Sequence, residues 1–335
     1  MSEGISIIAI MIKLVLILFV TLTLAAYMVL AERKILARIQ NRYGPNRAGP
    51  YGLLQPLADV IKMITKEDIV PADVDKTIFL VAPVVVAGTV LLSFAIVPFG
   101  APVHINGNSL PMPVIDLNVG VLYFLALSSL NVYGIALAGW SSGSKYSLLG
   151  GIRGSAQMIS YELSMGLSIV PAVMLAGSFN LSDIIAAQRH LPFVVYSPAG
   201  FLIFLISIAA ESKRIPFDLP EAENELVAGY HTEYSGIRFG LFYIGEYVNI
   251  IVLSALSVTF FLGGWLGPGP SWLSFFWFFL KSAAIAFSFI WMRATLPRLR
   301  YDQLMHMGWK YLVPLALLNV LVTGALALYF RWGVA

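Results

Sequence analysis

The chain has 335 residues, of which 59% are hydrophobic and only 12% are charged. A soluble domain of this length cannot bury so much apolar surface, so the composition predicts a polytopic membrane protein. The sequence has no cysteine and four scattered histidines, which excludes disulfides, thiolate zinc sites and cysteine-ligated iron–sulfur clusters within this chain and argues against a haem or metal site. The net charge of +3 is small, and we expect it to reflect membrane orientation rather than nucleic-acid binding.

Eight segments are apolar and long enough, at about 20 residues each, to cross a bilayer core of about 30 Å. They cover residues 5–30, 77–98, 118–138, 156–176, 192–210, 237–262, 272–292 and 312–330. We interpret the first as a retained span rather than a cleaved signal peptide. The fifth has the weakest pattern, because Tyr196, Ser197 and Pro198 interrupt its start. The expected fold is therefore all-α, with residues 1–335 forming one transmembrane domain.

The basic residues gather on one side of these spans. Seventeen of the 21 Lys and Arg residues lie in or beside the connections 31–76, 139–155, 211–236 and 293–311. Only Arg189 and Arg331 lie on the opposite side, and Lys13 and Lys281 lie within spans. The positive-inside rule then places these four connections in the cytoplasm and both termini on the other side of the membrane.

Residues 51–65 of the first connection repeat apolar side chains at helical spacing. The apolar positions are Leu53, Leu54, Leu57, Val60, Ile61 and Ile64. Asp59, Lys62 and Lys66 fall away from that face. The pattern predicts an amphipathic helix lying in the membrane interface, although packing of part of this face against the next span fits equally well.

The connection after the fifth span is strongly acidic. Its carboxylates are Glu211, Asp218, Glu221, Glu223 and Glu225, all within fifteen residues. Carboxylates concentrated at the mouth of a membrane span are costly to keep there, so the pattern indicates a functional site.

Two further acids, Glu162 and Glu246, lie inside spans, roughly 9 to 14 Å deep at about 1.5 Å per residue. Together with Glu233 and the acidic connection they form a row of carboxylates, which can hold and pass protons when poor solvation favours the neutral form. Simple pairing of Glu162 and Glu246 with basic groups or hydroxyls remains the alternative. Lys281, midway through the seventh span, is either a partner for one of these acids or a further relay member.

Several sequence motifs lie in the basic connections or directly beside them. They are AERK at 31–34, RYGPNRAGPYGLLQPLAD at 42–59, PFDLPEAENELVAG at 216–229, EYS at 233–235, GEY at 245–247 and RATLPRLRYDQLM at 293–305. Together they closely resemble the H-subunit family of respiratory complex I, the proton-translocating NADH:quinone oxidoreductase. The resemblance covers essentially the whole chain.

This resemblance implies a membrane-arm subunit, inactive alone, at the junction with the peripheral-arm quinone module. Its partners would be the other complex I subunits and the lipid bilayer, in a bacterial inner membrane with both termini on the periplasmic side. Ubiquinone or menaquinone would be the substrate. Iron–sulfur clusters and flavin would belong to partner subunits, which agrees with the absence of cysteine. No catalytic residue, metal site or covalently bound cofactor is expected in this chain.

The resemblance also implies roles for individual residues. A quinone-tunnel role is implied for Arg33, Ala58, Asp59, Arg214, Phe217 and Asp218. A role linking the quinone cavity to proton channels is implied for Glu162, Glu211, Glu221, Glu223, Glu225, Glu233 and Glu246. For Arg33, anchoring to anionic lipid headgroups is the competing explanation.

Two other functions remain as alternatives. The first is the membrane anchor of an energy-converting hydrogenase, which couples redox chemistry to ion movement without a quinone. The second is an independent proton-coupled transporter. The motif of the first connection favours a quinone site over the hydrogenase anchor. The lack of an internal repeat argues against the transporter.

Overall fold

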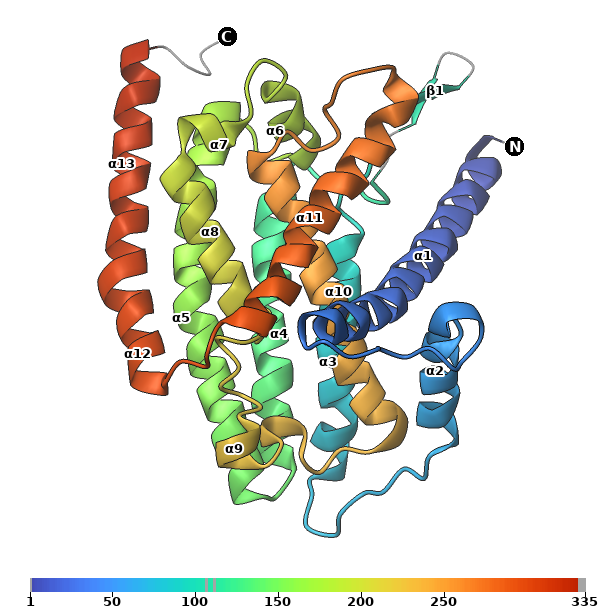
Figure 1. Cartoon of the computed structure of the whole chain (residues 1–335). Coiled ribbons are helices and arrows are strands. Elements are labelled where there is room, and N and C mark those ends of the chain that lie inside the picture. The colour runs from blue at the N-terminus through green and yellow to red at the C-terminus, as the bar shows by residue number, and fades with distance from the viewer. Residues whose placement is uncertain (1, 106–107, 111–112, 331–335) are drawn as a thin grey trace.

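The computed structural model describes residues 2–105, 108–110 and 113–330. The helices run alongside one another in one bundle (Figure 1). In the described part of the chain the only strands are β1 (Val103–Ile105) and β2 (Asn108–Leu110), which form a short antiparallel hairpin. The expectation of an all-α polytopic membrane protein is confirmed.

Seven described helices are long and apolar enough to cross a membrane. They are α1 (Ser2–Ile39), α3 (Lys76–Phe94), α4 (Gly120–Ser141), α5 (Lys145–Ala176), α10 (Gly236–Phe261), α11 (Ser274–Thr295) and a continuous run through α12 (Tyr301–His306), a π-helical segment (Met307–Leu312) and α13 (Val313–Phe330).

The fifth expected span is broken into two helices, α7 (Phe193–Tyr196) and α8 (Pro198–Glu211). Ser197 between them has φ −137° and ψ 67°, outside the helical region, and Pro198 cannot donate a backbone hydrogen bond to continue the helix. The Ser197 hydroxyl instead bonds the amide of Asn319 on α13. At 14 residues, α8 is shorter than the other seven helices.

The bundle is buried around α10, whereas α1 and α11 expose most of their side chains. Helices α3, α5 and α8 contact α10, and α4 packs against α3 and α5 (Figure 1). The contact of α3 with α4 depends on Gly134, because a Cβ atom there would lie 2.4 Å from the side chain of Val86. Helices α1 and α11 are inclined relative to the upright α5 and α13.

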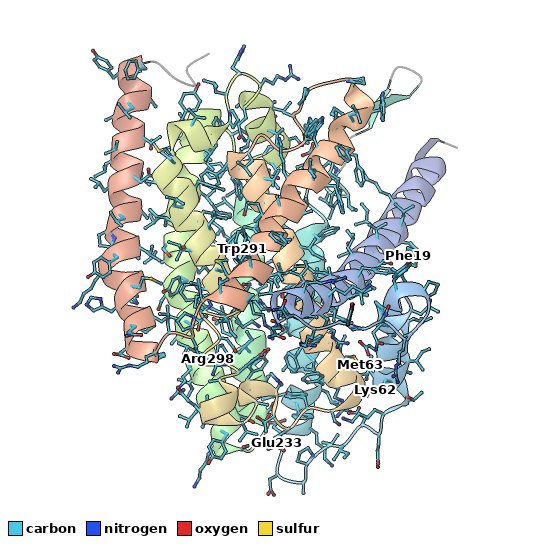
Figure 2. The ribbon with its side chains drawn as sticks, viewed as in Figure 1. Phe19, Lys62, Met63, Glu233, Trp291 and Arg298 are labelled. Carbon is cyan, nitrogen blue, oxygen red and sulfur yellow. The ribbon has the colours of Figure 1, made fainter. Side chains whose placement is uncertain are left out.

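The amphipathic helix is present as α2 (Gln55–Thr65), after a 3-10 turn (Pro50–Gly52). None of its residues is buried, and the six apolar side chains of the predicted apolar face are 43–65% exposed. Met63 lies toward α10 (Figure 2), where a Cβ atom on Gly240 would be 2.9 Å from its sulfur. One flank therefore packs against the bundle, and the apolar face remains uncovered.

The four basic connections lie toward the same end of the bundle, which we call the basic end (Figure 1). The acidic connection there contains α9 (Glu223–Leu226) and a 3-10 turn (Gly229–His231). The opposite end of the bundle holds α6 (Leu181–Ala187) and the 3-10 turn Ser271–Leu273. The start of α1 and the end of α13 also lie toward that end.

Candidate functional site

The acidic connection is fixed to the bundle immediately after α8. Lys213 adopts a left-handed φ of 54°, which is uncommon for a side chain of this size and turns the chain out of the helix. The buried amide of Gln157 on α5 donates to the carbonyls of Ala210 and Phe217, at 2.8 and 2.7 Å. The connection is therefore held at two points on either side of Lys213 and Arg214.

Arg214 is the centre of a buried group of charges. Its guanidinium contacts Glu32 Oε1 at 3.0 Å and Glu246 Oε1 at 2.6 Å. The Tyr247 hydroxyl donates to Glu32 Oε2 at 2.7 Å, and Arg293 pairs with the same carboxylate. We call Glu32, Arg214, Glu246, Tyr247 and Arg293 the Arg214 cluster. It joins α1, α10, α11 and the acidic connection.

The charges of the Arg214 cluster balance, with two carboxylates against two guanidiniums. Glu32, Arg214 and Glu246 are only 4%, 7% and 7% exposed, so each would be strongly destabilising without its partners. Sequence analysis had singled out Arg214 and Glu246 but not the other three members. The signal was present, because Glu32, Tyr247 and Arg293 all lie in the motifs that carry the family resemblance.

Lys213 connects the Arg214 cluster with the remaining buried acids. It is 3% exposed and interacts electrostatically with Glu246, Glu221 and Glu211. Burial lowers the pKa of Lys213, and these three acids oppose that shift. Its ammonium lies 5.3 Å from the centroid of the Tyr230 ring. Sequence analysis did not assign Lys213 a role, although it lies beside Arg214.

Asp218 and Glu221 lie in the part of the connection beyond α8, and both have raised pKa values. Burial raises the pKa of Asp218 to about 6, against the opposing effect of Arg298, whose guanidinium lies 2.7 Å away. Burial, followed by the charges of Glu246 and Asp218, raises the pKa of Glu221 to about 8. Glu221 is therefore protonated at neutral pH.

His231 faces Glu221 at 3.9 Å. Burial, followed by the charge of Lys213, lowers the pKa of His231 to about 4. At neutral pH this contact therefore joins two uncharged groups and is not an ion pair.

Glu211 and Glu162 are held by neighbouring serines of α4. The Ser128 hydroxyl donates to Glu211 Oε1 at 3.2 Å, and the Ser129 hydroxyl donates to Glu162. Glu211 is 2% exposed, and its second oxygen has no hydrogen-bond partner among the described residues. Neither carboxylate forms an ion pair within the described part of the chain, in contrast to the carboxylates of the Arg214 cluster.

The residues expected to line a tunnel occupy two places. Arg33 pairs with Asp59 at 2.8 Å, which ties α1 to α2, and Ala58 is exposed on α2. Arg214 and Asp218 lie in the acidic connection. Phe217 is only 5% exposed and packs against Tyr161, with ring centroids 5.7 Å apart. It therefore belongs to the core rather than to the uncovered face of α2.

The other acids of the expected row lie near the surface of the basic end. Glu225 pairs with Arg153 at 2.5 Å, and 52% of its side chain is exposed. Glu233 is half-buried in the turn before α10 (Figure 2). The side chain of Glu223 lies outside what the structure describes.

Lys281 does not join the carboxylates. Its ammonium donates to the carbonyls of Leu262, Gly264 and Leu266, at 2.7, 3.2 and 2.6 Å. These carbonyls follow the C-terminus of α10, where helix carbonyls lack intrahelical partners. The structure thus places Lys281 at the opposite end from the acidic connection, bound to backbone rather than to an acid.

Within the described residues, no group of three or more His, Asp or Glu side chains is arranged to hold a metal ion. The site consists instead of a neutral, buried ion cluster, two serine-bound acids and a lysine between them. Such an arrangement can accept, hold and redistribute protons.

Comparisons with known proteins agree with the motifs. The family model described as NADH dehydrogenase matches residues 12–324. The NADH-quinone oxidoreductase H subunit 2 of Geobacter sulfurreducens is 68% identical over 312 residues, covering 93% of this chain and 94% of the relative. The NADH-quinone oxidoreductase H subunit of Rickettsia rickettsii is 49% identical over 330 residues, covering 96% and 94%. The resemblance is confirmed: the chain belongs to the H-subunit family of NADH-quinone oxidoreductases, a family of membrane subunits of that enzyme complex.

Proposed function

We propose that this chain forms part of the quinone-binding tunnel of an NADH:quinone oxidoreductase and couples quinone reduction to proton translocation. The observation that carries the proposal is the Arg214 cluster with Lys213. Buried charges from α1, α10, α11 and the acidic connection meet there. This place lies near the C-terminal end of α1, the helix to which α2 is bound through the Arg33–Asp59 pair. The quinone is ubiquinone or menaquinone, and the chain is inactive without its partner subunits.

The passage for the quinone tail lies beside α2. A long isoprenoid tail needs an apolar opening to the bilayer, and the uncovered apolar face of α2 supplies one. The Arg33–Asp59 pair fixes this helix to the end of α1. Arg214 and Asp218 lie further in, where charged groups respond to a change in the redox state of the headgroup. Phe217 supports Asp218 from the core.

The proton path uses Glu162 and Glu211 inside the bundle and Glu221 in the acidic connection. Glu223, Glu225 and Glu233 form its outer opening. Glu246, held by Arg214, carries no proton itself and acts on the path only through its electrostatic effect on Lys213. Reduction of a quinone to a quinol takes up as many protons as electrons, so it withdraws protons from the groups beside the headgroup. Coupled carboxylates answer this withdrawal by redistributing their protons.

The electrons come from NADH through the flavin and iron–sulfur clusters of partner subunits. These partners dock on the basic end, which faces the cytoplasm of a bacterial cell, while both termini lie on the periplasmic side of the inner membrane. The bias of basic residues supports this orientation.

The test compares Glu211→Gln with Asp302→Asn in membranes containing the assembled complex. Glutamine keeps an oxygen for the Ser128 hydroxyl but cannot carry a proton. We expect Glu211→Gln to reduce NADH-driven proton pumping by roughly 100-fold, within the range contributed by a positioned acid–base group, and quinone reduction to fall with it. Asp302, whose side chain is 63% exposed and lies outside the proposed path, serves as the control. Pumping at the normal rate in assembled Glu211→Gln complex would overturn the proton role.

A further inference from the structure

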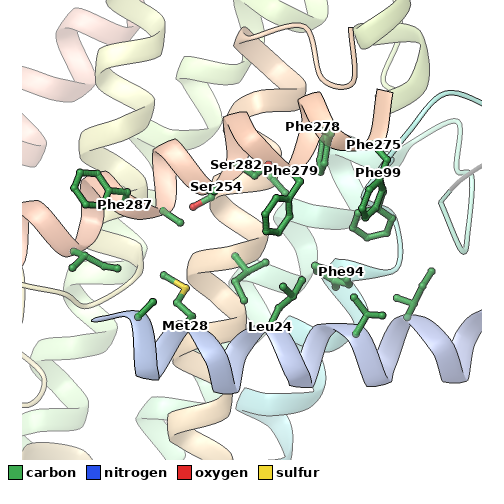
Figure 3. A pocket seen from close by; sticks show the side chains of 18 of the residues that line it. Leu24, Met28, Phe94, Phe99, Ser254, Phe275, Phe278, Phe279, Ser282 and Phe287 are labelled. Atoms are coloured by element: carbon green, nitrogen blue, oxygen red, sulfur yellow. The ribbon is translucent and has the colours of Figure 1, made fainter. Parts of the chain in front are cut away.

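The side of α1 that faces α11 borders an apolar cavity. The cavity has a volume of about 580 Å³ and separates α1 from α11, with α10 behind it (Figure 3). Leu24 and Met28 line it from α1, and Phe279 and Phe287 line it from α11. None of its lining residues belongs to α2 or to the acidic connection. It is therefore separate from the proposed quinone tunnel.

Small side chains on α10 and α11 leave this space open. Ser254 and Ala255 line it from α10, and Ser282, Ala283 and Ala286 lie among the larger lining side chains of α11. On α1 the lining residues run from Ile35 back to Lys13, which is roughly 33 Å at about 1.5 Å per residue. Half of a bilayer core is about 15 Å thick, so the cavity is long enough for a fatty acyl chain.

The cavity continues toward the basic end as a shallower recess. The recess is lined by Lys34, Ile35, Arg38, Ile39, Phe287 and Trp291, and it shares Ile35 and Phe287 with the cavity. Tryptophan and basic side chains at the end of an apolar span are typical of the headgroup level of a membrane. The apolar space and the two cations therefore form one continuous surface.

Neither Lys34 nor Arg38 pairs with a carboxylate in the described part of the chain. Arg33, Arg214, Arg293 and Arg298 each pair with a carboxylate. The Lys34 ammonium bonds only the carbonyl of Tyr51, and the Arg38 guanidinium lies 5.5 Å from the centroid of the Tyr43 ring. Two adjacent uncompensated cations attract an anion at this level of the membrane.

We propose that this surface binds one anionic phospholipid. Its phosphate lies between Lys34 and Arg38, and an acyl chain fills the cavity between α1 and α11. The two cations and the long apolar cavity together identify the occupant. A small anion would leave the cavity unfilled, and an uncharged lipid would leave the cations without a partner. The bound lipid braces α1 from the side opposite α2, and α1 carries Glu32 to the Arg214 cluster.

The test uses a phosphatidylglycerol probe with a photoreactive group in its acyl chain, added to the purified complete complex in phosphatidylcholine nanodiscs. We expect cross-links on α1 near Leu24 and Met28 and on α11 near Phe279 and Phe287. Lys34→Gln with Arg38→Gln removes two basic groups at the membrane surface and lowers probe affinity by roughly 30-fold. Arg42→Gln with Arg47→Gln is the matched control, because those exposed residues do not line the cavity.

A second variant separates the acyl chain from the headgroup. Ala286→Phe fills the cavity and leaves both cations in place, so the cross-links are lost although the complex still assembles. Inorganic phosphate, which has no acyl chain, does not displace the probe. Equal labelling by a phosphatidylcholine probe, displacement by inorganic phosphate, or recovery of quinone instead of phospholipid from the cavity would each overturn the proposal. None of these outcomes bears on the quinone and proton roles proposed above.

Discussion

The Arg214 cluster and the pair Glu162 and Glu211 place the same residue type in opposite electrostatic settings. Glu32 and Glu246 are each bound by a guanidinium, whereas Glu162 and Glu211 are bound only by the hydroxyls of Ser129 and Ser128. A buried carboxylate paired with arginine stays charged and fixes its neighbours. A carboxylate bound by a hydroxyl keeps its contact whether or not it carries a proton. The difference assigns an anchoring role to the first group and a proton-carrying role to the second.

Arg214→Met should have the largest effect. It leaves Glu32 and Glu246 in the core without their shared cation, which costs about 3–5 kcal/mol in comparable buried pairs. We expect little of the mutant chain in assembled complex, measured on native gels. Adding Glu32→Gln and Glu246→Gln removes the uncompensated charges and should restore much of the assembly. Full assembly of Arg214→Met alone would show that the cluster does not anchor α1.

Glu162→Gln and Glu246→Gln should fail in different ways. We expect Glu162→Gln to assemble normally and lose roughly 100-fold in proton pumping. Glu246→Gln removes a carboxylate from Arg214, so its main defect should be lower assembly. The measurement is proton pumping per assembled complex in reconstituted vesicles. Equal pumping defects per complex would remove the distinction between the two groups.

Stability should depend on pH through Glu221. Its pKa of about 8 lies above its ordinary value near 4.5, so the contribution is fully present below the ordinary value and is lost as pH rises through about 8. We expect the thermal stability of the complex to decline as pH rises from about 4.5 to about 8 and to level off above 8, and Glu221→Gln to flatten that decline. The matched control is Glu225→Gln, which should keep the wild-type pH profile.

Arg33→Gln and Asp59→Asn should have the smallest effect on stability. The two side chains are 43% and 26% exposed, and exposed pairs contribute at most about 1 kcal/mol. Assembly should therefore be unchanged. If the pair borders the tunnel, KM for a long-chain quinone rises while KM for a short-chain analogue does not. An equal change for both quinones would place the pair away from the path of the tail.

Hydropathy and charge in the sequence predicted the membrane helices and the amphipathic α2, because both depend on local composition. The broken fifth span was also visible there, at Ser197 and Pro198. The sequence could not show which charges meet. Glu32 and Arg214 are 182 positions apart, and only the packing of α1 onto α10 brings them together. The sequence also could not show the partners of Lys281. Its position within a span does not reveal that its ammonium binds backbone carbonyls.

The most direct test of the central claim is infrared difference spectroscopy of the assembled complex as its quinone becomes reduced. Carboxylates that carry protons should change their protonation, and the carboxyl band should lose one component in Glu211→Gln and another in Glu162→Gln. In this account Glu246→Gln leaves the band intact. A band unchanged by Glu211→Gln and Glu162→Gln, or one abolished only by Glu246→Gln, would contradict the assignment of proton transfer to the serine-bound pair.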